Sequence, residues 1–238
     1  MKFGPAAFLL GFFVTLSTQL VAQDQATAPT NPTSVPAGIN DKFKDVGLDV
    51  DEWLQRFEVE SREVYSARNE VLRACRVKSG ERVADVGAGT GFYSQLFARS
   101  ADWVYSVDIS PKFLQHIAGR ATTEGIENLT TVLGTDVSIR LPPESVDLVF
   151  ICDTYHHFES PAQSLASIYR AIKPGGRLVL IDFDRIPGVS REFLLGHVRA
   201  GKDVFQSEVV AAGFEFKDEV KIDVFEENYL LRFTKPVN

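Results

Sequence analysis

The sequence predicts an α/β protein with a doubly wound, mostly parallel sheet of seven strands and an antiparallel strand at the C-terminal end. Apolar, strand-like runs alternate with amphipathic helical segments over most of the chain. This is the pattern of a parallel sheet that helices cover on both faces. A glycine-rich turn follows the first run, and the link between the last two runs is too short for a crossover.

Seven segments have the length and apolar content of strands, and they span residues 82–87, 103–110, 129–136, 145–153, 177–184, 214–225 and 228–235. Apolar residues at helical spacing predict helices over residues 51–76, 92–100, 111–125, 160–172 and 201–214. Pro111 suits the first position of its helix, because an N–H at that position has no partner within the helix. Since the chain has no internal repeat, we expect residues 41–238 to form one domain.

The composition is that of a globular protein. The chain has 238 residues, of which 45% are apolar and 24% charged, enough for one domain with an ample core. Its formal net charge is −7, so a basic surface for nucleic acid is not expected. Cys75 and Cys152 are the two cysteines. One pair is no disulfide framework, and we expect two buried free thiols.

The first 40 residues differ from the rest. Lys2 is followed by an apolar run over residues 6–16 and by the small residues Val21 and Ala22, the layout of a secretory signal peptide over residues 1–22. The run is shorter than the roughly 20 residues of a membrane helix, so we expect cleavage and no stable membrane anchor. Residues 23–40, rich in proline and small polar residues, are predicted to be a flexible linker. The expected location is therefore outside the cytosol, periplasmic or secreted.

The turn after the first strand distinguishes two classes of nucleotide site. Its glycines are Gly87, Gly89 and Gly91, and Phe92 stands where the dinucleotide fingerprint G-x-G-x-x-G needs its third glycine. Asp85 precedes the turn, and a carboxylate there is unfavourable beside a pyrophosphate because like charges repel. Asp85 therefore favours a ligand that has an ammonium group and no phosphate, such as S-adenosylmethionine. A dinucleotide-dependent oxidoreductase is the less favoured alternative.

Four motifs in order, VADVGAGTG, VYSVDIS, GTDV and IKPGGRLVLIDF, resemble those of the class I S-adenosylmethionine-dependent methyltransferases, in particular the small-molecule enzymes of the type 11 kind. The resemblance covers roughly residues 51–235. It implies a Rossmann-like methyltransferase fold, S-adenosylmethionine as the cofactor, and methyl transfer by in-line displacement. It assigns cofactor binding to Tyr65, Asp85, Gly87, Ala88, Gly89, Gly91, Asp108, Ile109, Asp136, Val137 and Asp153.

Three acids at strand ends have separate roles in this resemblance. Asp108 matches the carboxylate that accepts both ribose hydroxyls, which its two oxygens suit. Asp136, with Val137 beside it, matches the acid that receives the adenine amino group, and Asp153 lies where the family lines the methionine moiety and the acceptor. Each acid alone has a simpler explanation, a helix cap for Asp108 and an ordinary loop acid for Asp136. Their conjunction with the glycine turn favours the cofactor.

Catalytic candidates follow the fourth strand, in CDTYHHF at residues 152–158. The methyl donor is already activated, so the main requirement is to hold the acceptor near it, and a base is needed only if the acceptor loses a proton. His156, His157 and Tyr155 are the candidate bases, His156 first, because histidine titrates near neutral pH. Either histidine can instead cap or pack. A metal site of Asp153, His156 and His157 has no recognised ligand spacing, so no metal is predicted.

The predicted helix over residues 51–76 resembles the lid of similar enzymes. A lid closes over the cofactor and excludes water, and Tyr65, Arg62 and Arg68 would then reach the methionine carboxylate or the acceptor. The alternative is a plain amphipathic cover helix with its aromatic residues in the core.

The acceptor is predicted to be a small molecule. The asparagine-proline-proline-aromatic signature of amino-group acceptors is absent after the fourth strand, which argues against nucleic-acid bases and glutamine amides. His197 and Arg199, after the fifth strand, are predicted to form the far wall of the acceptor pocket. A protein that binds the cofactor without turnover is the second hypothesis. The acceptor itself, its reacting atom and the oligomeric state are left open.

Overall fold

The computed structural model describes residues 1, 2, 4, 35 and 38–237. The predicted signal peptide and linker therefore lie almost wholly outside the described residues, and export stays a prediction. Within the described part of the chain, no helix combines the length and apolar character needed to cross a bilayer.

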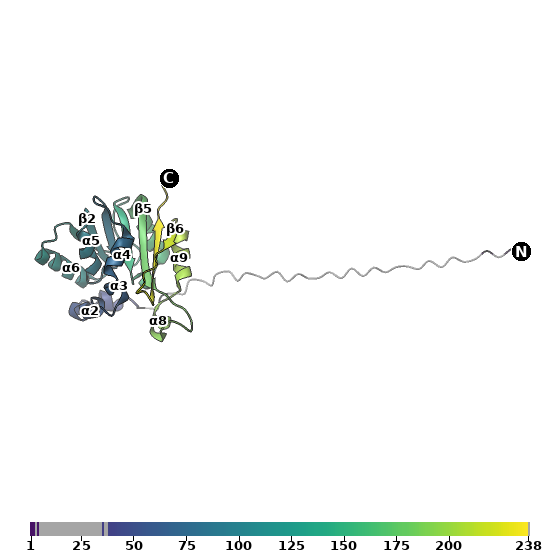
Figure 1. The fold of residues 1–238 in the computed structure, drawn as a ribbon, viewed down its shortest axis with the longest axis horizontal. Helices are drawn as coiled ribbons and strands as arrows, with labels where there is room; N and C mark the ends of the chain where they lie inside the picture. The colour runs from purple at the N-terminus through teal and green to yellow at the C-terminus, as the bar shows by residue number, and fades with distance from the viewer. Residues whose placement is uncertain (3, 5–34, 36–37, 238) are drawn as a thin grey trace. The chain divides into compact units, whose positions relative to one another are not determined.

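A seven-stranded sheet forms the centre of the fold (Figure 1). Its strands are β1 (Arg82–Val86), β2 (Trp103–Asp108), β3 (Leu129–Leu133), β4 (Val146–Cys152), β5 (Ile172–Phe183), β6 (Glu215–Glu219) and β7 (Asn228–Thr234). They are arranged in the order β3-β2-β1-β4-β5-β7-β6. The first five run parallel, and β7 runs antiparallel to both β5 and β6. The predicted doubly wound, mostly parallel sheet with an antiparallel C-terminal strand is confirmed.

The segment before β1 is helical, but the single helix predicted over residues 51–76 is wrong. The segment forms α2 (Val50–Phe57), α3 (Glu63–Ser66) and α4 (Arg68–Cys75), with α1 (Asp41–Lys44) before them. None of residues 58–62 is buried, so the apolar stripe is interrupted there and nothing holds the chain helical across the gap. The break lets Phe57 line the cavity described below while Val64 joins the core.

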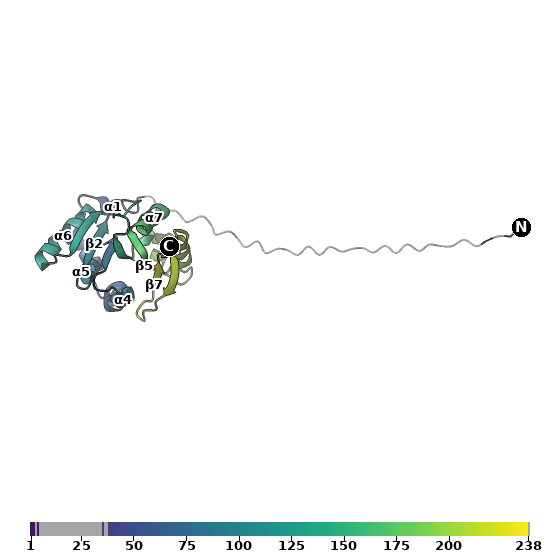
Figure 2. The ribbon, with the colours of Figure 1, turned by 90° about the horizontal axis from the view of Figure 1, so that it is seen from above.

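Helices cover both faces of the sheet, which explains its continuous apolar strands. They include α5 (Phe92–Ala98), α6 (Pro111–Glu124), α7 (Pro161–Ala171) and α9 (Lys202–Ala211). On one face, Leu165 of α7 and Phe205 of α9 belong to one buried cluster, and on the other, Val71 of α4 and Phe97 of α5 belong to a second. Figure 2 shows α7 and α4 on opposite sides of the sheet. Cys75 and Cys152 are both free thiols, as predicted, but only Cys75 is buried and Cys152 is partly exposed.

The carboxyl ends of the five parallel strands lie at the same end of the sheet, where ligands bind in folds of this kind. The short 3-10 helix η1 (Tyr155–His157) follows β4, and α8 (Glu192–His197) follows β5. Helix α8 lies in a stretch for which the sequence predicted no helix. Strand β6 is the outermost strand on one side of the sheet. It ends at Glu219, before the predicted limit of residue 225, because Ile222 turns into the second buried cluster. Figure 1 shows α2, α3 and α8 at the same end of the sheet.

Candidate active site

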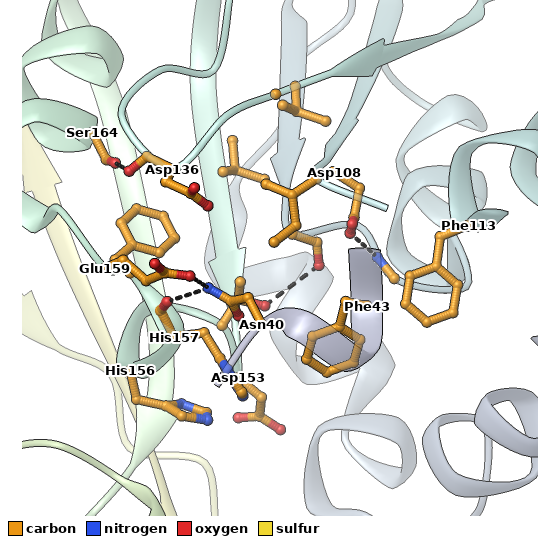
Figure 3. Close-up of a pocket in the computed structure, with 18 of the residues that line it drawn as sticks. Asn40, Phe43, Asp108, Phe113, Asp136, Asp153, His156, His157, Glu159 and Ser164 are labelled. Atoms are coloured by element: carbon orange, nitrogen blue, oxygen red, sulfur yellow. Dashed lines mark hydrogen bonds between the residues drawn. The ribbon is translucent and has the colours of Figure 1, made fainter. Parts of the chain in front are cut away.

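A cavity of about 400 Å³ opens at the carboxyl edge of the sheet (Figure 3). Its walls are the ends of β1, β2 and β5, the loops after β3 and β4, and side chains of α1, α2, α6 and α8. A volume of this size is typical of small-molecule sites. The sequence-predicted residues that line it are Arg62, Gly87, Gly89, Asp108, Ile109, Asp136, Asp153, His156, His157 and His197.

The glycine loop between β1 and α5 forms one wall of the cavity. Gly87 has a φ of +75° and Gly89 a φ of +54°, values that other residues adopt only with strain. A Cβ atom at Gly87 would lie 2.1 Å from Cγ2 of Thr154, and one at Gly89 would lie 3.3 Å from the ring of Phe57. Only glycine therefore fits Gly87, where the backbone passes directly along the cavity.

The backbone N–H groups of this loop are already engaged within the protein. Those of Gly87 and Ala88 donate to the carbonyl of Val107 at 2.8 and 3.1 Å, and that of Gly89 donates to Oδ2 of Asp108 at 2.9 Å. A pyrophosphate site needs such N–H groups to point at the phosphates. The loop is consequently a poor dinucleotide site and a suitable wall for a ligand without phosphate.

Asp108 occupies the end of β2 and is 7% exposed. Besides Gly89, the N–H of Ser110 donates to its Oδ1 at 2.8 Å. Burial raises the pKa of Asp108 to about 6, although these backbone hydrogen bonds act in the opposite direction. Ser110, and not Asp108, caps α6, so capping does not explain the acid. Each carboxylate oxygen keeps a lone pair for a further donor, which fits the two hydroxyls of a ribose.

Asp136 follows β3 and is held from two sides. Nζ of Lys44 lies 2.9 Å from its Oδ1 and 3.0 Å from its Oδ2, and the hydroxyl of Ser164 donates to its carbonyl oxygen at 3.0 Å. The neighbouring Val137 is 43% exposed and does not line the cavity. An amino donor from an adenine would therefore meet Asp136 together with the ammonium group of Lys44.

Asp153 comes directly after β4 and has a φ of +48°, a strained value of the kind found at functional sites. Its Oδ2 pairs with Arg62 at 2.5 Å, and its Oδ1 accepts from Nδ2 of Asn228 at 2.7 Å. Burial raises the pKa of Asp153, and the positive charge of Arg62 opposes the rise. The pair connects the segment before β1 to the floor of the cavity, as a closed lid would.

Asp85 lies away from the cavity. Side chains alternate along β1, and Val86 takes the side that faces the cavity. The carboxylate of Asp85 accepts from the hydroxyl of Ser94 at 2.6 Å, and Ser106 donates to Ser94 at 2.8 Å. Burial raises the pKa of Asp85 to about 7. This network joins β1 and β2 to α5, and it gives Asp85 no contact with a ligand in the cavity.

The structure does not bring Tyr65, Ala88 or Gly91 to the cavity either. The ring of Tyr65 packs on Phe92, with 4.6 Å between centroids, and Arg68 lies over its other side. Of the three residues predicted to reach the methionine carboxylate or the acceptor, Arg62 alone lines the cavity.

Tyr155 and Arg199 belong to the core. Tyr155 is fully buried and donates its hydroxyl to Glu208 at 2.7 Å. Arg199 pairs with Glu208 at 2.5 Å and lies over the ring of Tyr155. Burial also raises the pKa of Tyr155. Neither residue lines the cavity, so the structure offers no support for Tyr155 as a base or for Arg199 as a pocket wall.

His156 is oriented by Asp182, a residue that the sequence analysis missed. Nδ1 of His156 lies 2.7 Å from Oδ1 of Asp182, and the backbone N–H of His156 donates to Oδ2 at 3.0 Å. Since a carboxylate only accepts, Nδ1 carries the proton and Nε2 keeps its lone pair. In the parallel pairing of β4 and β5, Cys152 lies opposite Ile181. The residues after β4 therefore come beside the end of β5, and this register would have indicated the contact between His156 and Asp182.

His157 and His197 complete a group of three imidazoles. His197 reaches the group from α8, and its ring centroid is 5.0 Å from those of His156 and His157. Burial lowers the pKa of His157 to about 2 and that of His197 to about 4, and the neighbouring imidazole of His156 acts in the same direction. Both rings are therefore neutral at physiological pH.

Residues 38–44, which we call the strap, cross the cavity and were not predicted to belong to it. Asn40 donates from Nδ2 to the carbonyl of His157 at 3.0 Å and to Glu159 at 2.8 Å (Figure 3). Phe43 packs against Trp53 and Phe113, with centroids 5.0 and 6.2 Å away. The strap has no periodic apolar pattern, so only Phe43 could have indicated from the sequence that it packs against anything.

Comparison with known proteins supports one family. Residues 84–180 match the family model described as a methyltransferase domain. A demethylmenaquinone methyltransferase of Tropheryma whipplei is 35% identical over 113 residues, which cover 46% of this chain and 46% of the relative. A mitochondrial ubiquinone biosynthesis O-methyltransferase of Schizosaccharomyces pombe is 32% identical over 118 residues, 49% of this chain and 43% of the relative. The chain thus spans about half the length of these curated relatives.

A solved structure extends the likeness over more of the chain. The S-adenosylmethionine-dependent methyltransferase of Aquifex aeolicus matches with a TM-score of 0.68 and 20% identity, covering 78% of this chain and 98% of that one. At this identity the likeness establishes the fold. It includes most of the described domain and so extends beyond the segment that the family model matches.

Proposed function

We propose that this chain, which belongs to the class I S-adenosylmethionine-dependent methyltransferases, transfers a methyl group to a small-molecule acceptor. One observation carries the proposal. Asp108, Asp136 and Asp153 follow three strands that are successive in the chain, β2, β3 and β4, and all three line a single cavity beside the glycine loop. A structural role for any one of these acids does not explain their convergence.

The residues present fit the cofactor. Asp108 offers two carboxylate oxygens to the ribose hydroxyls, and beside it Gly87 and Gly89, which have no side chains, line the cavity. Asp136 is placed to accept from the adenine amino group. Arg62 and Asp153 form the ion pair at the methionine end. When bound, S-adenosylmethionine supplies an activated methyl group, so the task of these side chains is to hold and orient.

The acceptor end favours a flat, apolar small molecule. Phe43, Phe183 and Phe193 line the cavity near the three histidines, and aromatic walls suit a ring-shaped ligand. The curated relatives named for demethylmenaquinone and for ubiquinone biosynthesis support the same class, a quinone-like precursor. His156, whose Nε2 keeps a lone pair, stays the first candidate for a base if the acceptor carries a proton on its reacting atom.

Calorimetry with S-adenosylhomocysteine tests the proposal. We expect saturable binding by the full chain, no binding of NADH, and at least a hundredfold loss of affinity in Asp108→Ala, because two buried donors lose their acceptor. Asp102→Ala is the matched control, since Asp102 precedes β2 at the opposite edge of the sheet and its side chain is 53% exposed. A folded chain that does not bind S-adenosylhomocysteine would contradict the methyltransferase proposal.

The second hypothesis, a cofactor-binding protein without turnover, makes the same binding prediction. The two are separated by incubating the full chain with methyl-labelled S-adenosylmethionine and a set of hydroxylated aromatic acceptors. Transfer of label to any of them supports the enzyme, and tight binding with no transfer to the whole set supports the binding protein.

A further inference from the structure

We infer that His156, His157 and His197 form a binding site for a divalent transition metal ion, with Zn²⁺ the best match, at the acceptor end of the cavity. The role given to the ion below rests on the proposed function, whereas its binding does not. This set differs from the one weighed from the sequence, in which Asp153 is the third ligand. The structure pairs Asp153 with Arg62 and brings His197 to the two adjacent histidines instead.

The ring nitrogens of the three imidazoles are close together, but slightly farther apart than the ligands of a bound metal ion. One ring nitrogen of each lies within 4.8 Å of those of the other two. The ring centroids of His156 and His157 are 4.4 Å apart. Zn–N bonds of about 2.0–2.1 Å would put the nitrogens of a tetrahedral site roughly 3.3 Å apart, so modest side-chain rotations close the set around an ion.

Asp182 prepares His156 for this role. The carboxylate accepts a hydrogen bond from Nδ1–H of His156 and is itself fully buried and fixed by the backbone N–H groups of His156 and Phe183. A histidine that donates to a carboxylate through one nitrogen and binds metal through the other is a recurrent arrangement in zinc sites, and it raises the basicity of the ligand. No such support is needed by a histidine that only packs.

His157 provides a second, independent observation. Within the described part of the chain, its buried Nδ1 has no hydrogen-bond partner, which is uncommon for a buried polar atom. Lys42 of α1 is the positive charge that acts on the rings of His157 and His197, and Asp182 and Asp153 are the negative charges beside the group.

Three protein ligands leave one position of a tetrahedral ion open, which is the arrangement of catalytic zinc sites. Since all three histidines line the cavity, the open position faces the space left for the acceptor. The ligand it would take there is a hydroxyl or thiol of the acceptor. Bound to the ion, such a group has a lowered pKa and releases its proton to solvent, so the lone pair of His156 would serve the metal and no separate base would be needed.

Metal titration of the full chain tests the site without any measurement of activity. After dialysis against a chelator, Zn²⁺ binding is measured by calorimetry, and Co²⁺ binding by the visible absorption that reports its coordination geometry. We expect one tight site, about a hundredfold or more loss of affinity in His197→Ala because one of three ligands is removed, and about 10–100-fold loss in Asp182→Asn. His116 is the one histidine of the chain outside this group. His116→Ala is therefore the matched control and should bind Zn²⁺ like the wild type.

Circular dichroism of each variant shows whether it folds, and His197→Gln replaces His197→Ala if the latter does not. Absence of tight binding by the folded wild-type chain, or equal binding by wild type and the His197 variant, would overturn the site, and the three rings would then be neutral packing partners. Asp108→Ala separates this inference from the proposed function. We expect it to lose S-adenosylhomocysteine and to keep Zn²⁺.

Discussion

The two ends of the cavity are built in different ways. At the end proposed to bind the cofactor, called the cofactor end below, the N–H groups of the glycine loop donate to the carbonyl of Val107 and to the carboxylate of Asp108, which ties the end of β1 to that of β2. At the acceptor end, side chains from α1, η1 and α8 meet, and His157 contacts Phe43 and His197 through ring edges. In Figure 3, Asp108 and Asp136 lie in the upper part of the view, and His156 and Asp153 lie in the lower part.

This difference separates what the sheet determines from what loops determine. A residue at the end of a parallel strand is positioned by the backbone hydrogen bonds between the strands. A residue on a short helix in a loop is positioned by the side chains around it. The cofactor end is therefore the part that a shared fold carries from one protein to the next. The acceptor end is free to vary, which agrees with one fold serving many acceptors.

Gly87→Ala tests the rigidity of the cofactor end and should have the largest effect. The substitution places a Cβ atom 2.1 Å from Thr154 at a φ of +75°. The left-handed backbone costs about 1–2 kcal/mol, and overlap with a packed side chain adds about 1–3 kcal/mol. We expect the free energy of unfolding, measured in urea, to fall by about 3 kcal/mol, and S-adenosylhomocysteine affinity to fall with it.

Gly80→Ala isolates the contribution of the overlap. Gly80 has a φ of +85°, and a Cβ atom there would have nothing within 4 Å. Its loss of stability should be the backbone strain alone, about 1–2 kcal/mol, with no change in cofactor affinity. Equal losses in the two variants would mean that Thr154 moves aside and that the loop is softer than its hydrogen bonds indicate.

The pH dependence of cofactor binding is the next largest effect, and it arises at Asp108. The pKa of Asp108 in the free protein is about 6, and the ionised form is the better acceptor for two hydroxyls. Hydroxyl donors favour the charged form, so S-adenosylhomocysteine affinity should fall as pH falls below about 6, by up to tenfold per pH unit. Calorimetry between pH 5 and 8 measures it.

Two variants assign this dependence to one carboxylate. Asp108→Asn should bind weakly and show no fall below pH 6. Asp85→Asn should keep the fall, since Asp85 also has a raised pKa but lies outside the cavity. If the fall disappears in Asp85→Asn and not in Asp108→Asn, the carboxylate that the cofactor senses is Asp85, and the placement of the ribose at Asp108 is wrong.

The sequence identified side chains at both ends of the cavity, and its errors at each end have a physical reason. Strand ends are readable from apolar runs, the family resemblance assigned Asp108, Asp136 and Asp153 at three of them, and the structure brings all three to the cavity. Asp85 was misplaced because the motif gives the residue and only the alternation of side chains along β1 gives its side. Asp182 was missed because its partner His156 lies far along the chain, and the sequence placed His197 at the pocket wall without revealing its contact with the other two histidines.

The N-terminal region shows the limit of periodicity as a signal. The apolar spacing of residues 51–76 indicated helix correctly, but it did not reveal the break over residues 58–62, where the sequence loses its apolar stripe for little more than one turn. The strap has too few apolar residues for any period. Its position depends on Phe43 and on the hydrogen bonds of Asn40, contacts that have no pattern in the sequence.

Lys44→Met sharpens the comparison where the two ends meet, and it should have the smallest effect. The ion pair of Lys44 with Asp136 is over a third exposed on both sides, so its loss should change stability by less than about 1 kcal/mol. Because the ammonium group competes with an amino donor for Asp136, we expect S-adenosylhomocysteine affinity to rise a few-fold, and less so in high salt. Lys217→Met, which breaks an exposed pair on β6, should change neither quantity. A lowered affinity in Lys44→Met would instead make the strap part of the cofactor site, and the cofactor end would then depend on a loop as much as the acceptor end does.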